Sequence, residues 1–80
     1  MPDDCFEQVR ALAATTLGVD PASLDAQTCS ANLPAWDSLA HLQILRAVER
    51  HYGLKLPRLA SYTVANLGEL AALVSRTRPT

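Results

Sequence analysis

The chain has 80 residues, a hydrophobic fraction of 49% and a formal net charge of −1, so it forms one small domain without room for a large enclosed catalytic cleft. Aromatic residues make up only 5%, and much of the apolar fraction is Leu, Ala and Val, which favours an all-α fold over a β-sandwich. The bases are dispersed and no segment approaches the roughly 18 to 20 apolar residues of a membrane span, so neither a nucleic-acid-binding nor a membrane function is expected.

The N-terminal segment predicts a helix over about residues 3–17. Its apolar residues follow the three-and-four spacing of an amphipathic helix, at Phe6, Val9, Leu12, Ala13 and Leu17. A long loop over residues 18–36 follows, with a short helical turn near 21–24. We expect Leu24 and Leu33 to anchor this loop on the bundle.

Three further elements are predicted in the second half of the chain. A helix spans about 38–52 and ends before Gly53, a short helical turn covers about 57–62, and Thr63 caps a last helix over about 63–75. The apolar positions that define the two longer helices are Leu42, Leu45, Val48 and Tyr52, and then Val64, Leu67, Leu70, Ala71 and Val74. The fold class is therefore a small bundle of three to four helices, with a long loop between its first and second helices.

The segment Trp36-Asp37-Ser38-Leu39 is the most informative part of the sequence. Asp37 is a good N-cap, which places Ser38 on the first turn of the second helix with its hydroxyl facing solvent. An exposed serine at the positive end of a helix suits the attachment of a phosphate-linked group. Taken alone, however, an Asp-Ser pair also fits the simple start of a helix.

The wider pattern resembles the acyl carrier proteins. The Asp-Ser-Leu motif lies near the midpoint after a long loop, the segment 42–57 is similar to the family's second helix and its exit, and the resemblance extends to about Val74. It implies that Ser38 attacks coenzyme A in the active site of a phosphopantetheinyl transferase and then carries a 4′-phosphopantetheine arm. Asp37 and Leu39 are the motif neighbours, and Leu39 is expected to turn toward the groove between helices.

The resemblance implies a discrete acyl carrier that is not itself an enzyme. It would tether acyl intermediates as thioesters and deliver them to acyl-loading and acyl-processing enzymes, which raises the effective concentration of the tethered substrate. It is expected to be cytoplasmic, because Met1-Pro2-Asp3-Asp4 is acidic where a secretion signal would be basic and then apolar. A monomer is also expected.

The expected partner surface departs from the common family pattern. Many acyl carriers present an acidic second helix to basic enzyme patches, whereas Glu49 is the main acid here and Arg46 replaces a commonly apolar contact residue. The residues assigned to this surface are Trp36, Gln43, Arg46, Glu49 and Arg50. We therefore expect a specialised pathway (polyketide, modified fatty-acid or hybrid peptide) with less basic or more apolar partners and weak salt dependence. For Trp36 itself, packing of the end of the loop against the second helix is the favoured interpretation over that of a binding aromatic.

Two other functions stay open at this point. An aminoacyl or peptidyl carrier would share the fold, although its motif is more often of the Gly-Gly-x-Ser-Leu type. A helical interaction module without a prosthetic group, including a helix-turn-helix regulator, is the alternative from another class. A hydrolase built from Asp37, Ser38 and His41 is disfavoured, because neighbours on one helical turn do not readily form a catalytic triad and no oxyanion hole is apparent.

The remaining chemistry-bearing side chains are few. Cys5 and Cys29 have no zinc or CxxC spacing, and we expect two reduced, unreactive thiols, with one disulfide between them as the open alternative. His41 and His51 are expected at exposed polar positions. With two histidines and no supporting carboxylate cluster, the sequence predicts no metal site.

Overall fold

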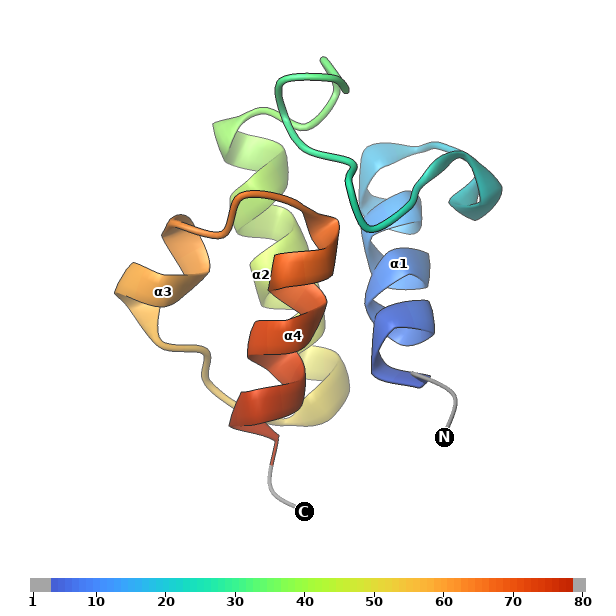
Figure 1. Cartoon of the computed structure of the whole chain (residues 1–80). Coiled ribbons are helices and arrows are strands. Elements are labelled where there is room, and N and C mark those ends of the chain that lie inside the picture. The colour runs from blue at the N-terminus through green and yellow to red at the C-terminus, as the bar shows by residue number, and fades with distance from the viewer. Residues whose placement is uncertain (1–3, 79–80) are drawn as a thin grey trace.

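The computed structural model describes residues 4–78, and within that range it contains helices and loops but no strand. The elements are α1 (Asp4–Leu17), the 3-10 turn η1 (Pro21–Ser23), α2 (Ser38–Tyr52), α3 (Arg58–Tyr62) and α4 (Leu67–Thr77). In Figure 1, α1, α2 and α4 form the bundle, α3 is a short flanking helix, and the long loop crosses the end where α2 and α4 begin. The predicted all-α bundle is confirmed. The expected first residue of the first helix, Asp3, lies outside the described residues.

The core lies where α1 packs against both α4 and α2. Every long helix contributes apolar side chains at the predicted spacing, and the largest fully buried ones are Leu24, Ile44, Leu67, Leu70, Val9, Val48 and Val74. Each such side chain stabilises the fold by about 1.5–3 kcal/mol relative to leaving it in water. Cys5 lies in the same core, and both it and the half-buried Cys29 are free thiols.

The bounds of α2 agree with the helix predicted over 38–52. The Asp37 carboxylate caps its start, because Oδ1 accepts a hydrogen bond from the backbone N–H of Ala40 at 2.8 Å. Gly53 ends it in the left-handed region at φ 65°, where a residue with a Cβ would be strained. Beyond this glycine, Oε2 of Glu49 accepts from the backbone N–H of Leu56 at 2.8 Å and fixes the chain as it leaves the helix.

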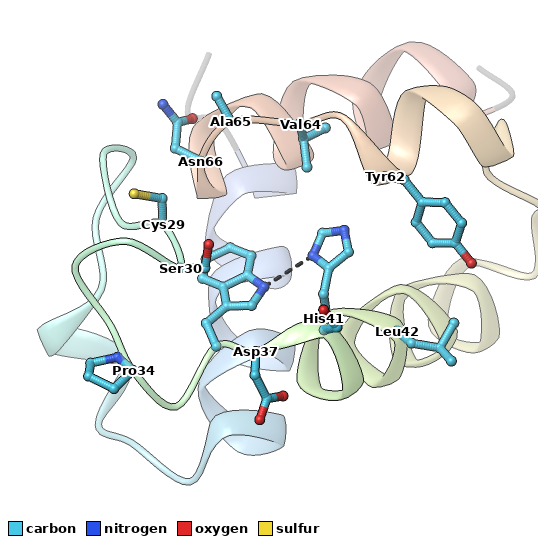
Figure 2. A pocket seen from close by; sticks show the side chains of 12 residues that line it. Cys29, Ser30, Pro34, Asp37, His41, Leu42, Tyr62, Val64, Ala65 and Asn66 are labelled. Atoms are coloured by element: carbon cyan, nitrogen blue, oxygen red, sulfur yellow. Dashed lines mark hydrogen bonds between the residues drawn. The ribbon is translucent and has the colours of Figure 1, made fainter.

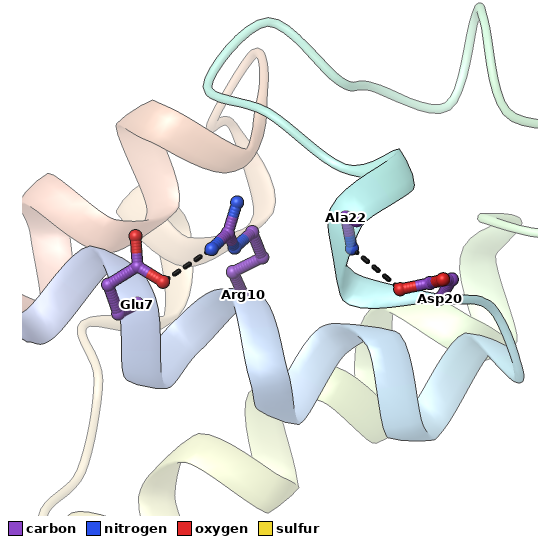
Figure 3. A network of polar contacts seen from close by, with 4 residues as sticks. All are labelled: Glu7, Arg10, Asp20 and Ala22. Atoms are coloured by element: carbon purple, nitrogen blue, oxygen red, sulfur yellow. Dashed lines mark hydrogen bonds and ion pairs between the residues drawn. The ribbon is translucent and has the colours of Figure 1, made fainter.

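The loop over residues 18–36 is held by short-range polar contacts and by buried anchors. Figure 3 shows the Asp20 carboxylate capping η1 through the backbone N–H of Ala22, next to the Glu7–Arg10 ion pair on α1. Leu24 is buried as predicted and Leu33 is partly buried. The loop is therefore a structured part of the fold, which gives the residues that precede α2 fixed positions.

The expected start of the last helix is wrong. The sequence predicted a helix over 63–75 with Thr63 as its cap, whereas α4 begins at Leu67 and Asn66 is its N-cap. The Thr63 hydroxyl instead donates to the carbonyl of Leu59, at the end of α3. Asn66 has the stronger capping geometry, because its Oδ1 accepts from the backbone N–H of Glu69 at 2.8 Å.

The long loop completes the N-terminus of α4. The backbone N–H groups of Leu67 and Gly68 donate to the carbonyls of Thr28 and Ala26, at 2.8 and 2.9 Å. The first N–H groups of a helix have no partner within the helix, so the loop satisfies two of them. The approach is close: a Cβ built on Gly68 would lie 2.9 Å from the Cβ of Ala26. The absence of a side chain at this position lets the loop reach the helix.

Candidate phosphopantetheine attachment site

Ser38 is the first residue of α2 and is exposed. Its backbone position is fixed by the Asp37 cap, and the Asp37 carbonyl also accepts from the backbone N–H of His41 at 2.9 Å. Among the described residues, the Ser38 hydroxyl has no hydrogen-bond partner. The structure therefore presents a free hydroxyl on a rigid helical turn.

A pocket of about 750 Å³ opens beside Ser38. Its walls come from three segments: the end of the long loop, the first turns of α2 and the link between α3 and α4. Figure 2 shows these walls, with Cys29 and Asn66 on one side and Leu42 and Tyr62 on the other. The lining mixes polar and apolar groups, and the volume falls within the range of about 300–1,000 Å³ typical of small-molecule sites.

Trp36 and His41 form the inner wall of the pocket. The indole N–H of Trp36 donates to Nδ1 of His41 at 3.1 Å, and Nε2 of His41 lies 2.8 Å from the carbonyl oxygen of Ser61 (Figure 2 draws the first contact). An indole nitrogen can only donate, so Nδ1 accepts and the imidazole proton is on Nε2, from which it is donated to Ser61. One neutral histidine thus joins the loop, α2 and α3.

These contacts decide between the two interpretations of Trp36 and correct the position of His41. Trp36 is only 4% exposed, so it packs the end of the loop as favoured, and its assignment to the partner surface is wrong. His41 is partly buried and fully hydrogen-bonded, in contrast to the exposed position expected for it, whereas His51 is exposed as expected. The three-residue spacing from Ser38 indicated that His41 is near the site. Its link to Ser61 depends on the packing of α3, for which the sequence carries no local signal.

Leu39 also differs from the expectation. It was expected to turn into the groove between helices, but it is 64% exposed, because position 39 faces away from the side of α2 that carries the buried Ile44 and Val48. Gln43, Arg46 and Arg50 are exposed as expected for a partner surface. Glu49 is half-buried and engaged with the backbone of Leu56. It is therefore a structural acceptor and not a free surface acid.

The geometry does not support catalysis by Ser38. Both ring nitrogens of His41 already have partners, so no base is available to take the serine proton. Within residues 4–78, no group of three metal-ligating side chains lies close enough together to hold an ion. In the same range, none of the helices has both the length and the apolar character that crossing a membrane requires.

Comparison with known proteins identifies the family of the chain. The family model described as "phosphopantetheine attachment site" matches residues 7–74. The solution structure of a holo acyl carrier protein from Geobacter metallireducens superposes with a TM-score of 0.79 at 26% sequence identity, covering 90% of this chain and 83% of that one. No curated protein sequence matches significantly.

The chain therefore belongs to the acyl carrier protein family and carries a phosphopantetheine prosthetic group. Members of this family are carriers without catalytic activity of their own, and they interact with a phosphopantetheinyl transferase and with biosynthetic enzymes. The family match over most of the chain also replaces the alternative of an interaction module without a prosthetic group.

Proposed function

We propose that Ser38 is the attachment residue and that the protein delivers acyl intermediates, held as thioesters, within a specialised biosynthetic pathway. The observation that carries this proposal is the exposed, unpartnered Ser38 hydroxyl at the start of α2, beside an open pocket. When bound, the phosphopantetheine group supplies the terminal thiol that forms the thioester. The chain itself supplies the position and exposure of the Ser38 hydroxyl.

The start of α2 is suited to a phosphodiester. The unpaired N–H groups and the helix dipole favour a negative charge there by about 0.3–1 kcal/mol. Asp37 opposes this slightly through its own charge, but it caps the helix and holds Ser38 in place. Attachment at this point places the modified residue on a helix that is anchored in the core. The phosphopantetheine arm can then move while the serine that carries it stays in place.

The pocket beside Ser38 suits the arm and a small cargo. Val64 and Tyr62 contribute apolar surface, while Asn66 and Ser30 contribute groups that can hydrogen-bond an amide-containing chain. Trp36 belongs to the buried core and, together with His41, also lines this pocket. This arrangement supports an arm that rests against the surface between visits to partner enzymes.

The outward face of α2 supports the assignment to a specialised pathway. Gln43, Arg46 and Arg50 occupy it, and Glu49 is held by the backbone of the following segment. A carrier that serves enzymes with basic patches would need exposed acids on this helix. The polyketide, modified fatty-acid and hybrid peptide pathways are the classes we propose for this chain.

The test of the attachment residue is intact mass after incubation with coenzyme A and a broad-specificity phosphopantetheinyl transferase. We expect the wild type to gain the mass of one phosphopantetheine group, Ser38→Ala to gain none, and Ser30→Ala to gain as the wild type does. Ser30 is the matched control because it is also exposed and lines the same pocket. A mass gain in folded Ser38→Ala would assign attachment to another residue.

The cargo class is tested on the loaded protein. Acyl and aminoacyl donors, each with its own loading enzyme, are compared by the second mass increment. We expect acyl transfer to the holo form and none to Ser38→Ala. Loading by aminoacyl donors alone would contradict the acyl assignment and favour a peptidyl carrier.

A further inference from the structure

We propose that the exposed face of α2 and α3 docks a protein partner whose surface is acidic around an apolar centre. This inference rests on the function proposed above, because it describes the surface that surrounds the attachment residue. It concerns the sign of the charge on the partner, which the geometry of the serine does not address.

The outward side of α2 forms a stripe that starts next to Ser38. Leu39, Gln43, Arg46 and Arg50 are all exposed and are separated by four, three and four residues, which places them on one side of a helix. The stripe is about three turns long. It carries one large apolar side chain at its start and two guanidinium groups further along, and none of its members is acidic.

The short helix α3 and the segment before it extend this surface. Lys55 and Arg58 are exposed cations, and Leu59 and Tyr62 are 79% and 52% exposed. The hydrogen bond between His41 and Ser61 fixes α3 beside α2. With Leu39, the two helices thus display the three large hydrophobic side chains that are exposed among the described residues.

The charges on this surface have no partners within the described chain. Between residues 38 and 62 the sequence has four bases and one acid, Glu49. Glu49 accepts a hydrogen bond from the backbone of Leu56, and the salt bridge found among the described residues is between Arg10 and Glu7 on α1. The acids that flank this segment in the sequence are Asp37, which caps α2, and Glu69, which accepts a hydrogen bond from the backbone N–H of Ala65. The two helices and the segment between them therefore carry four uncompensated cations together with three exposed apolar side chains.

This combination fits a protein partner better than a polyanion. Arginine and aromatic residues are enriched at protein interfaces, and complementary charges at the rim set the encounter rate and the register. The surface includes two exposed leucines, which do not recognise a phosphate backbone, and the whole chain has a net charge of −1. An acidic rim on the partner would pair with the cations, and an apolar centre would cover Leu39, Leu59 and Tyr62. The weak salt dependence expected from the sequence is accordingly replaced by a marked one.

The test uses two designed amphipathic helical peptides with the same leucine face, one with a glutamate rim and one with a lysine rim. Each is titrated into the 15N-labelled holo protein, and amide shifts are followed at about 0.05 and 0.5 M salt, between which the screening length falls severalfold. We expect the glutamate peptide to bind at least about fivefold more tightly and to shift amides of α2 and α3. This preference should shrink at high salt.

Charge reversal identifies the residues responsible. Arg46→Glu/Arg50→Glu should weaken binding of the glutamate peptide at least about fivefold and strengthen binding of the lysine peptide. Reversing the charges of both protein and peptide should therefore restore binding. Arg76→Glu, an exposed cation on α4, is the matched control and should change neither affinity. Near-ultraviolet circular dichroism verifies that each variant is folded.

Several outcomes would overturn the proposal: equal binding of both peptides, shifts confined to other elements, or an Arg76→Glu effect as large as that of the double reversal. Tighter binding of an RNA oligonucleotide or of anionic phospholipid vesicles to the same face would assign the cations to those ligands instead. Ser38→Ala is titrated in parallel. Loading at Ser38 without peptide preference overturns the docking surface alone, whereas peptide preference with loading at another residue overturns the attachment residue alone.

Discussion

The indole N–H of Trp36 donates to Nδ1 of His41 at 3.1 Å, and the two rings are nearly parallel, at an interplanar angle of 23°. Nε2 of His41 in turn donates a hydrogen bond to the carbonyl oxygen of Ser61. The end of the long loop and the first turn of α2 are thereby joined to α3, about twenty residues later, beside the pocket that Ser38 lines. Ser38 and His41 line the same pocket, so the imidazole is part of the surface beside this serine.

Replacing this imidazole should cost stability. We expect His41→Ala to lower the free energy of unfolding by about 1–3 kcal/mol, because the buried indole N–H of Trp36 and the carbonyl of Ser61 both lose their partner. The measurement is urea denaturation followed by circular dichroism. His51→Ala, at an exposed position on the same helix, is the control and should stay within about 0.5 kcal/mol of the wild type.

A double-mutant cycle separates the hydrogen bond from general packing. Trp36→Phe removes the N–H donor, so His41→Ala should cost less in the Trp36→Phe background than in the wild type. Equal costs in both backgrounds would show that the Trp36–His41 contact contributes no specific energy.

Gly68 should not tolerate a side chain. A Cβ at this position would meet the Cβ of Ala26 at 2.9 Å and its carbonyl oxygen at 3.0 Å, so the loop would have to move away from α4. We expect Gly68→Ala to destabilise the protein by about 1–3 kcal/mol despite the better helix propensity of alanine. The same urea titration measures the change.

If contact with Ala26 causes the loss of stability in Gly68→Ala, then adding Ala26→Gly should restore part of it. Removing the Cβ of Ala26 relieves one of the two close contacts and leaves the one to the carbonyl, so recovery should be incomplete. A stabilised Gly68→Ala variant would instead mean that the loop is not held against α4.

The features that could be predicted from the sequence are those set by neighbours in the chain. Apolar spacing, the Asp37 cap and Gly53 were sufficient to give α2 its bounds, since each acts within one or two turns of a helix. The start of α4 was misplaced although a local signal is present, because Asn66 caps the helix and Glu69 follows three residues later. What no local pattern shows is that the N–H groups of Leu67 and Gly68 bond to carbonyls of Thr28 and Ala26, about forty residues earlier.

The same distinction holds at the site. Ser38 could be placed from the motif because its exposure follows from its position on the first helical turn. The bond from His41 to Ser61 depends on where α3 packs, and α3 is only five residues long. Leu39 lies opposite the core, as its own helical phase requires, and not toward the groove between helices as expected.

The Asp37 carboxylate should matter for the shape of the site more than for its charge. We expect Asp37→Ala to lower the free energy of unfolding by about 0.5–2 kcal/mol, because the N–H of Ala40 loses its acceptor at the start of α2. Asp37→Asn keeps a capping oxygen and should lose much less. Chemical denaturation gives the stabilities. If the asparagine variant were as unstable as the alanine variant, the cap would act through its charge on the helix dipole and not through the hydrogen bond.

The exposure of Leu39 predicts that its side chain contributes almost nothing to folding. Leu39→Ala should change the free energy of unfolding by less than about 0.5 kcal/mol, because the side chain is 64% exposed and leaves no cavity. Leu67→Ala makes the same chemical change at a fully buried position and should cost about 2–5 kcal/mol. The two variants are compared in one urea series. A large loss for Leu39→Ala would mean that this leucine packs into the groove between helices, and the docking surface would then lack the apolar side chain next to Ser38.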